Sequence, residues 1–184
     1  MSIYDAIASI EDRSRRGYAS QLLFRAEAAA RGYVPSTPEW NLSMDHILID
    51  AEHPHRLVRV EVKQSAQERS GGYVVELRGS QGIGGSEGSK KGQARLHEYE
   101  KSVDIIAIFL PLASCWYLIP EAKLRGASNV TLRPDNENSK HFEYREAWHV
   151  IDASMHAVGD APTERPRRDA SKSEPSGGSE GRAE

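Results

Sequence analysis

Apolar and polar residues alternate along VRVEVKQSA, residues 58–66, in a pattern that is typical of a β-strand. The three valines fall on one face of such a strand, so Arg59, Glu61 and Lys63 project from the other face. The valine face is expected to contact an apolar core. The opposite face carries a carboxylate beside an ammonium group, and this is the first indication of a chemical site.

Residues 20–31 have the clearest helical pattern in the chain. They are rich in strong helix formers, and Gly32 follows them as a helix terminator. The spacing of the larger apolar residues predicts that the buried stripe of this helix consists of Leu22, Leu23, Ala26 and Ala30.

Further strands are predicted from short apolar runs. The most apolar run, 103–111, is expected to be a central buried strand, and 115–120 its antiparallel partner. The remaining strands are expected at 44–50, at 71–79 and, at an edge of the sheet, at 129–134.

Two more segments complete the expected order of elements. A short helix is predicted at 93–101, and the closing segment 141–152 is also expected to be helical. The order is therefore helix, three strands, helix, two or three strands, helix. This order predicts an α/β fold in which helices flank a mixed β-sheet.

Composition limits how much of the chain is expected to fold. The 184 residues have a single-domain length, but only 38% of them are hydrophobic, which is low for a fully folded protein of this size. The deficit falls in 157–184, where Pro, Gly, Ser and mixed charges dominate. We expect a folded domain over 1–156 followed by a disordered, low-complexity tail.

Charge, cysteine content and hydropathy bear on partners and compartment. The net charge of −3 does not indicate a general nucleic-acid binder, so basic contacts must be local; RSRR at 13–16 is the densest candidate. The single cysteine, Cys115, excludes an internal disulfide and a cysteine-rich zinc site, which fits a reducing compartment. No stretch approaches the roughly 20 apolar residues of a membrane span, so a cytoplasmic protein without membrane contact is expected.

The strand face with Glu61 and Lys63 gains a third polar group from the preceding strand. Asp45 opens that strand, and a turn near His53 and His55 is compatible with antiparallel pairing of the two strands. Neighbouring strands lie about 4.8 Å apart, so Asp45 and Glu61 can share a divalent cation if the register brings them opposite. Carboxylates suit Mg²⁺, which keeps several waters and accepts substrate phosphates.

These residues resemble a known superfamily. Asp45, fifteen residues and then EVK, after a first helix that bears Glu27, is similar to the pattern of the PD-(D/E)xK phosphodiesterases. Within it the likeness is closest to group I intron-associated endonucleases and archaeal-type Holliday junction resolvases. It spans roughly residues 18–133 and includes the late segments VDIIAIF and WYLIP. Two departures are the Met44 that precedes Asp45, where the superfamily has its proline, and the lack of a Q-x-x-x-Y motif on the later helix.

The resemblance implies a restriction-endonuclease-like αβββαβ core and a metal-dependent endonuclease that hydrolyses the phosphodiester bonds of DNA. It implies Asp45 and Glu61 as metal ligands, Lys63 as the catalytic lysine, Glu27 as an additional ligand or water holder, and Mg²⁺ or Mn²⁺ as the cofactor. It also implies a homo-oligomer, a dimer or tetramer, because two DNA strands must be cut. Structure-selective cleavage as by a Holliday junction resolvase, a non-catalytic DNA-binding module, and a protein-interaction module that uses the tail remain as alternatives.

Other polar groups have simpler interpretations. Asp50 is the rival of Asp45, but it projects from the opposite face of its strand. His53 and His55 lack a third ligand at a suitable spacing and indicate a turn. The glycine-rich stretch 79–92 lacks the spacing of a phosphate-binding loop, and it is expected to be mobile or to contact the DNA backbone through Lys90 and Lys91.

Overall fold

The computed structural model describes residues 1–39, 44–77 and 102–159. It begins with two helices, α1 (Ile3–Ala8) and α2 (Arg13–Ala30). Three strands follow, β1 (Tyr33–Ser36), β2 (His46–Asp50) and β3 (Leu57–Gln64). The expected glycine-rich loop at 79–92 and the expected helix at 93–101 lie outside the described residues.

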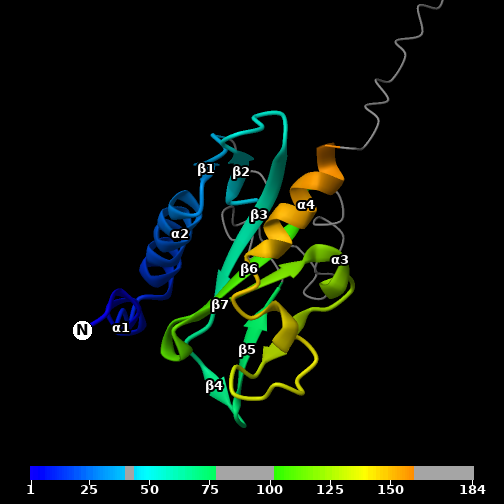
Figure 1. Cartoon of the computed structure of the whole chain (residues 1–184). Coiled ribbons are helices and arrows are strands. Elements are labelled where there is room, and N and C mark those ends of the chain that lie inside the picture. Colours follow the sequence, from blue (N-terminus) through cyan, green and yellow to red (C-terminus); the bar gives the residue numbers. More distant parts are fainter. Residues whose placement is uncertain (40–43, 78–101, 160–184) are drawn as a thin grey trace, which may run out of the picture.

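The remaining elements are short and alternate between strands and helices (Figure 1). In chain order they are β4 (Glu68–Arg69), β5 (Gly72–Glu76), β6 (Ile105–Leu110), the 3-10 helix η1 (Pro111–Ala113), β7 (Cys115–Pro120), α3 (Glu121–Leu124), β8 (Asn129–Leu132), η2 (Phe142–Tyr144) and α4 (His149–Gly159). Helix α4 thus continues past the domain boundary expected at residue 156.

The main sheet has five strands in the order β1-β2-β3-β6-β7. Strand β3 pairs with β6 in parallel, and the other neighbours pair in antiparallel fashion, so the predicted mixed sheet is confirmed. All six residues of β6 are buried, as expected of a strand with neighbours on both sides. Strand β7 is its antiparallel partner, as the sequence predicts.

A second, three-stranded sheet has the order β4-β5-β8. The strands predicted at 71–79 and 129–134 therefore exist, but they pair with each other rather than extend the main sheet. Gly72 explains their close approach, since a Cβ there would lie 2.9 Å from Thr131 Cγ2. Ser70 and Gly71 both have positive φ and close the tight turn between β4 and β5.

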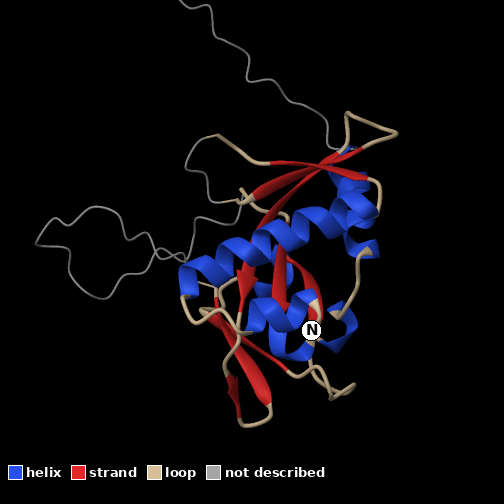
Figure 2. Cartoon of the chain, turned by 90° about the vertical axis from the view of Figure 1, so that its left-hand side faces the viewer, coloured by secondary structure: helices blue, strands red, loops and turns tan. Residues whose placement is uncertain are grey.

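Helices α2 and α4 pack on the face of the main sheet that carries the valines of β3, and Figure 2 shows the helices against the strands. Phe24 of α2 is fully buried and stacks on His46 at 5.9 Å and on Trp148 at 5.7 Å. The buried stripe of α2 is Ser20, Phe24 and Ala28, not the stripe predicted from 22, 23, 26 and 30. Small residues on either side of Phe24 let the helix lie close to the sheet, which leaves Leu22 exposed.

The closing segment, predicted to be helical from residue 141, has the short 3-10 helix η2 at Phe142–Tyr144, and its α-helix begins only at His149. Glu146 has a positive φ of 51°, which a helix cannot accommodate. Its N–H donates to Trp116 O at 2.8 Å, and its carboxylate accepts from Trp116 N at 2.6 Å. The segment therefore covers part of the outer edge of β7 before α4 begins.

None of the helices in the described part of the chain is both long enough and apolar enough to cross a membrane.

Candidate active site

Asp45 lies directly before β2 and beside β3. The antiparallel register of the two strands ends with the pair of His46 and Val60, and Asp45 N donates to Val60 O at 3.0 Å. Asp45 also accepts from Val62 N on β3, so its side chain lies next to the segment of β3 that carries Glu61 and Lys63.

The side chains of this pair meet in a cluster with Lys63. The carboxyl group of Asp45 lies near Glu61 and Lys63, which both bear on its pKa, and Lys63 Nζ donates to Glu61 Oε1 at 2.5 Å. The structure thus brings together three of the four residues that the sequence singles out. We call Asp45, Glu61 and Lys63 the carboxylate cluster.

Two further groups fix the orientation of Asp45. Val62 N donates to Asp45 Oδ2 at 2.7 Å, and Gln21 Nε2 donates to Asp45 Oδ1 at 2.8 Å. The first contact comes from β3 itself and the second from α2. Both oxygens of the carboxylate are therefore held before any ligand arrives, which is the preorganisation that a binding or catalytic site needs.

Burial raises the pKa of Asp45, and the hydrogen bond from Val62, the charge of Lys63 and the contact with Glu61 oppose this rise. Glu61 is buried, with 9% of its surface exposed. Two neighbouring carboxylates offer each other only acceptors and carry like charges. A cation between the two groups would relieve their repulsion.

The donor set of the cluster fits a hard divalent cation. It offers carboxylate oxygens and no sulfur or imidazole, as Mg²⁺ and Mn²⁺ prefer. Within the described residues no three His, Cys, Asp or Glu side chains are grouped to hold a metal. Two carboxylates leave most of an octahedral shell for water and for a substrate phosphate, which is the usual way in which proteins bind Mg²⁺.

Glu27, the fourth predicted site residue, is not brought to the cluster. Its Oε1 accepts from Tyr4 Oη at 2.9 Å and from Trp116 Nε1 at 3.1 Å, and its Oε2 pairs with Arg31 at 3.3 Å. Trp116 belongs to the same face of the sheet as Phe24, the face opposite to Glu61. The geometry gives Glu27 a structural task in place of the predicted one as a ligand or water holder.

The rival aspartate, Asp50, lies at the other end of β2. It accepts from the N–H groups of Glu52 and His53 at 2.9 and 3.1 Å, and its second oxygen contacts His53 Nδ1 at 3.1 Å. These contacts order the turn between β2 and β3. The prediction of a turn around His53 and His55 is thus confirmed.

Sequence reasoning missed Gln21. Its contact with Asp45 depends on which side of α2 faces the sheet, and the periodicity of the helix did not reveal this. The only local indication of this contact is that a polar residue stands three positions before Phe24. Many helices have a polar residue at such a position without any role in a site. Cys115 is buried on β7.

The sheet, its helices and the carboxylate cluster define a restriction-endonuclease-like α/β fold. The family model for the PD-(D/E)XK endonucleases matches residues 14–151, about three quarters of the chain. The chain belongs to this endonuclease family.

A solved structure has the same fold. It is described as the structure of a bacterial homing endonuclease, I-Ssp6803I, and it superposes with a TM-score of 0.60 at 21% sequence identity. The match covers 81% of this chain and 97% of the homing endonuclease. Comparison with curated protein sequences found no significant match.

Proposed function

We propose that the chain is a divalent-metal-dependent DNA endonuclease that hydrolyses phosphodiester bonds at Asp45, Glu61 and Lys63. The observation that carries the proposal is the proximity of Asp45 to Glu61, with Lys63 two residues further along the same face of β3 and in contact with Glu61. Membership of the endonuclease family supports the reaction class.

Asp45 and Glu61 would hold the metal ion, Mg²⁺ or Mn²⁺. When bound, such an ion supplies a nucleophilic hydroxide at neutral pH and offsets the charge that develops on the phosphoryl oxygens. The protein's own part is to hold the two carboxylates near each other, with Val62 N and Gln21 Nε2 fixing Asp45. This arrangement limits reorganisation during the reaction.

Lys63 is the positive group of the cluster. Its ammonium donates to Glu61 Oε1, and the side chain is 19% exposed, so it lies at the border between the buried pair and the solvent. From there it would donate a hydrogen bond to the attacking water or to a phosphoryl oxygen. While it is charged, the ammonium group has only donors and cannot accept a proton. Its charge also offsets part of the negative charge on the two carboxylates.

The experiment that tests the proposal is a cleavage panel with the purified chain. Supercoiled, linear and four-way-junction DNA are incubated with Mg²⁺, with Mn²⁺ or with EDTA, beside Lys63→Ala and its control Lys123→Ala, a lysine on α3. We expect nicking that EDTA abolishes and that Lys63→Ala loses while Lys123→Ala retains it.

Cleavage in EDTA, or full cleavage by Lys63→Ala, would overturn the proposal. The DNA that is cleaved fastest distinguishes an enzyme that cuts at a duplex site from one that resolves four-way junctions. Binding without cleavage by the wild-type chain would instead support the non-catalytic DNA-binding module.

We also propose that the active form is a homo-oligomer, because hydrolysis of both strands of a duplex requires two such sites. Light scattering coupled to gel filtration checks this directly. A mass of one chain at concentrations at which both strands are cut would contradict it.

A further inference from the structure

The side of α2 next to the carboxylate cluster has the features of a path for a DNA strand. Gln21 reaches Asp45 from this helix. Tyr18 and Gly17 precede Gln21 by three and four residues, so they lie on the same side of the helix one turn earlier, and Ser14 lies there one turn before them. We call Ser14, Gly17, Tyr18 and Gln21 the α2 track.

The α2 track is open to solvent around Tyr18. Tyr18 is 63% exposed, and it has no hydrogen bond or ring contact with another residue in the described ranges. A Cβ built on Gly17 would meet nothing within 4 Å. The ring of Tyr18 therefore stands in free space one helical turn from a residue that contacts the cluster.

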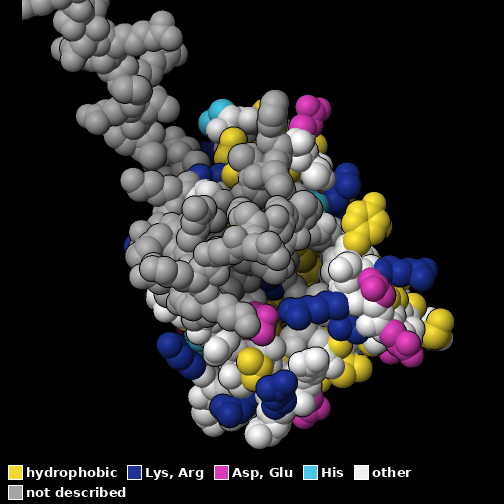
Figure 3. All heavy atoms as spheres, turned by 180° about the vertical axis from the view of Figure 1, so that it is seen from behind, with side chains coloured by type: hydrophobic (Ala, Val, Ile, Leu, Met, Phe, Trp, Pro, Cys, Tyr) yellow, Lys and Arg dark blue, Asp and Glu magenta, His cyan; other side chains and the backbone are white. Residues whose placement is uncertain are grey.

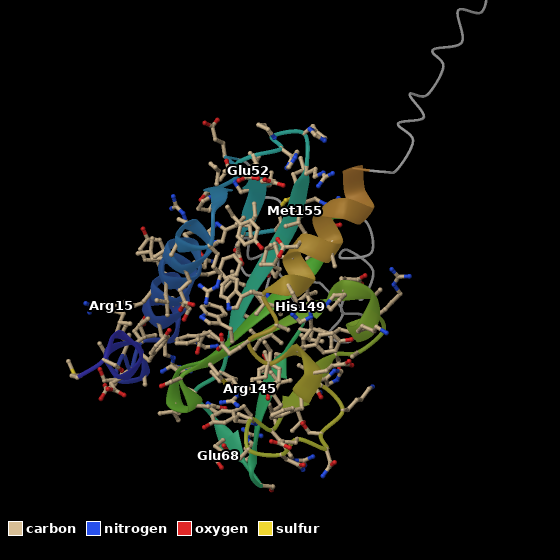
Figure 4. All side chains as sticks on the ribbon, viewed as in Figure 1. Arg15, Glu52, Glu68, Arg145, His149 and Met155 are labelled. Carbon is tan, nitrogen blue, oxygen red and sulfur yellow. The ribbon has the colours of Figure 1, made fainter. Side chains whose placement is uncertain are left out.

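Positive charge lies at the start of the same helix. Arg15 is exposed, and its guanidinium group has no partner among the residues that the structure describes. Arg13 forms an exposed pair with Glu76 at 3.5 Å, and Arg16 is anchored to Gln64 at 3.1 Å and to a main-chain carbonyl. Figure 4 shows Arg15 beside α1.

Helix stability does not account for these arginines. The first turn of α2 has no acidic residue, and cations there are disfavoured by the helix dipole. Lys and Arg side chains lie among hydrophobic, Asp and Glu side chains on the part of the surface to which α1 and α2 belong (Figure 3). The exposed guanidinium group of Arg15 is suited to contact a single phosphate of a polyanion there.

The spacing along the helix fits neighbouring nucleotides. Six residues separate Arg15 from Gln21, which is about 9 Å of helix at 1.5 Å per residue. At about 3.4 Å per nucleotide of one strand, this corresponds to roughly three nucleotides. A protein partner would instead favour a longer row of large apolar residues, but on α2 only Leu22 accompanies Tyr18 as an exposed large apolar side chain, and Ser14 and Gly17 lie beside them.

We infer that the α2 track guides one DNA strand into the carboxylate cluster, with the Tyr18 ring stacked on a base next to the phosphate held at Asp45 and Glu61, and with Arg15 on a phosphate further along. Aromatic stacking does not depend on base identity, so this contact positions the strand and does not read its sequence. The inference rests on the proposed function, since it assigns the path by which DNA reaches that site.

The test is binding measured without cleavage. Fluorescein-labelled mixed-sequence oligonucleotides, single-stranded and duplex, are titrated by anisotropy in EDTA and in Ca²⁺ at several salt concentrations. Tyr18→Ala is expected to bind roughly tenfold or more weakly, and Tyr18→Phe to keep the wild-type affinity, because stacking needs only the ring. Arg15→Ala is expected to reduce the slope of log affinity against log salt by about one, whereas Tyr18→Ala leaves this slope unchanged.

Matched controls come from exposed residues of other elements. Val34→Ala removes a side chain that is 50% exposed on β1, and Arg69→Ala removes an exposed arginine at the β4–β5 turn. Both are expected to bind DNA as the wild-type chain does. Gel filtration accompanies each variant, and a changed mass with unchanged DNA affinity would assign Tyr18 to a contact between copies of the chain and overturn the inference.

The outcomes separate the inference from the proposed function. Wild-type affinity in Tyr18→Ala and an unchanged salt slope in Arg15→Ala would overturn the α2 track even if the chain cleaves DNA. The expected losses of binding in a chain that never cleaves would support the track and refute the nuclease. A wild-type chain that binds none of the oligonucleotides would overturn both.

Discussion

Two groups of carboxylates lie around the main sheet, and their surroundings differ. On the face covered by α2 and α4, Glu27 accepts hydrogen bonds from Tyr4 and Trp116 and pairs with Arg31. Glu146 on the same side accepts from Trp116 N at 2.6 Å and from the Trp148 indole at 3.2 Å. Each of these carboxylates is surrounded by donors and is satisfied within the fold.

In the carboxylate cluster, Asp45 and Glu61 lie near each other. Burial raises the pKa of Asp45, which accepts from Val62 N and Gln21 Nε2. Lys63 supplies one positive charge for the two acidic groups. The comparison teaches that the fold gives Glu27 and Glu146 separate sets of donors, whereas it places two acidic groups together in the cluster, and this marks the place for a cation.

The largest expected effect is on cleavage. Asp45→Asn removes one of the two charges that would hold the metal, so we expect a loss greater than the roughly 10–100-fold that follows removal of an outer partner of a metal ligand. Asp50→Asn is the matched control, because Asp50 lies at the opposite end of the same strand and orders a turn. Equal rates for the two variants in the plasmid-nicking assay would show that the pair does not carry the reaction.

The next effect concerns the face covered by helices. Phe24 is fully buried between His46, Trp116 and Trp148, so Phe24→Ala should lower the free energy of unfolding by about 3–5 kcal/mol. Leu22→Ala, on the exposed side of α2, should change it by less than about 0.5 kcal/mol. Urea unfolding followed by tryptophan fluorescence measures both. Similar losses in the two variants would contradict the observed orientation of α2.

A smaller effect on cleavage is expected from Gln21, a positioning residue. Gln21→Ala leaves one oxygen of Asp45 without its donor, so kcat should fall by about 10–100-fold while KM for DNA and the melting temperature stay close to the wild-type values. Single-turnover kinetics separate these quantities. A raised KM at constant kcat would mean that Gln21 binds substrate rather than orients Asp45.

The smallest effect is a dependence of stability on alkaline pH. Burial, followed by the hydrogen bond and charge of Glu27, raises the pKa of Tyr4 from 10 to about 12. A pKa that is raised in the folded state contributes stability below pH 10, and this contribution is lost as the pH rises from 10 to 12.

Tyr4→Phe should therefore be less stable than the wild-type chain at pH 8, by about 1 kcal/mol for the lost hydrogen bond, and the difference should shrink toward pH 12. Urea unfolding at pH 8, 10 and 11.5 measures it. A difference that grows with pH would refute the structural task assigned to Glu27.

Local patterns predicted the parts of the fold that depend on local chemistry. The valine alternation placed Glu61 and Lys63 on one face of β3, and the apolar run at 103–111 identified the central strand, because both signals arise within one strand. The sequence could state the approach of Asp45 to Glu61 only as a condition on strand pairing, and in the structure Asp45 lies near Glu61 and accepts from Val62 N.

Features set by tertiary packing were not predictable in this way. The orientation of α2 depends on how Phe24 fits among aromatic residues from distant segments, and this orientation decides which polar residue of the helix reaches the site. The resemblance favoured Glu27 for its carboxylate, but the packing brings Gln21, six residues earlier, to Asp45. The second sheet, likewise, depends on pairing between β5 and β8, which are far apart in the sequence.

The most direct test of the account is a crossed pair of isosteric substitutions, Glu61→Gln and Glu27→Gln, each measured for metal-dependent cleavage and for the free energy of unfolding. We predict that Glu61→Gln abolishes cleavage and leaves the fold at least as stable in EDTA, because it relieves the repulsion within the pair. Glu27→Gln should cleave normally but lose about 1–2 kcal/mol of stability. Cleavage retained by Glu61→Gln, or cleavage lost in a fully stable Glu27→Gln, would contradict the catalytic role proposed for Glu61 and the structural role proposed for Glu27.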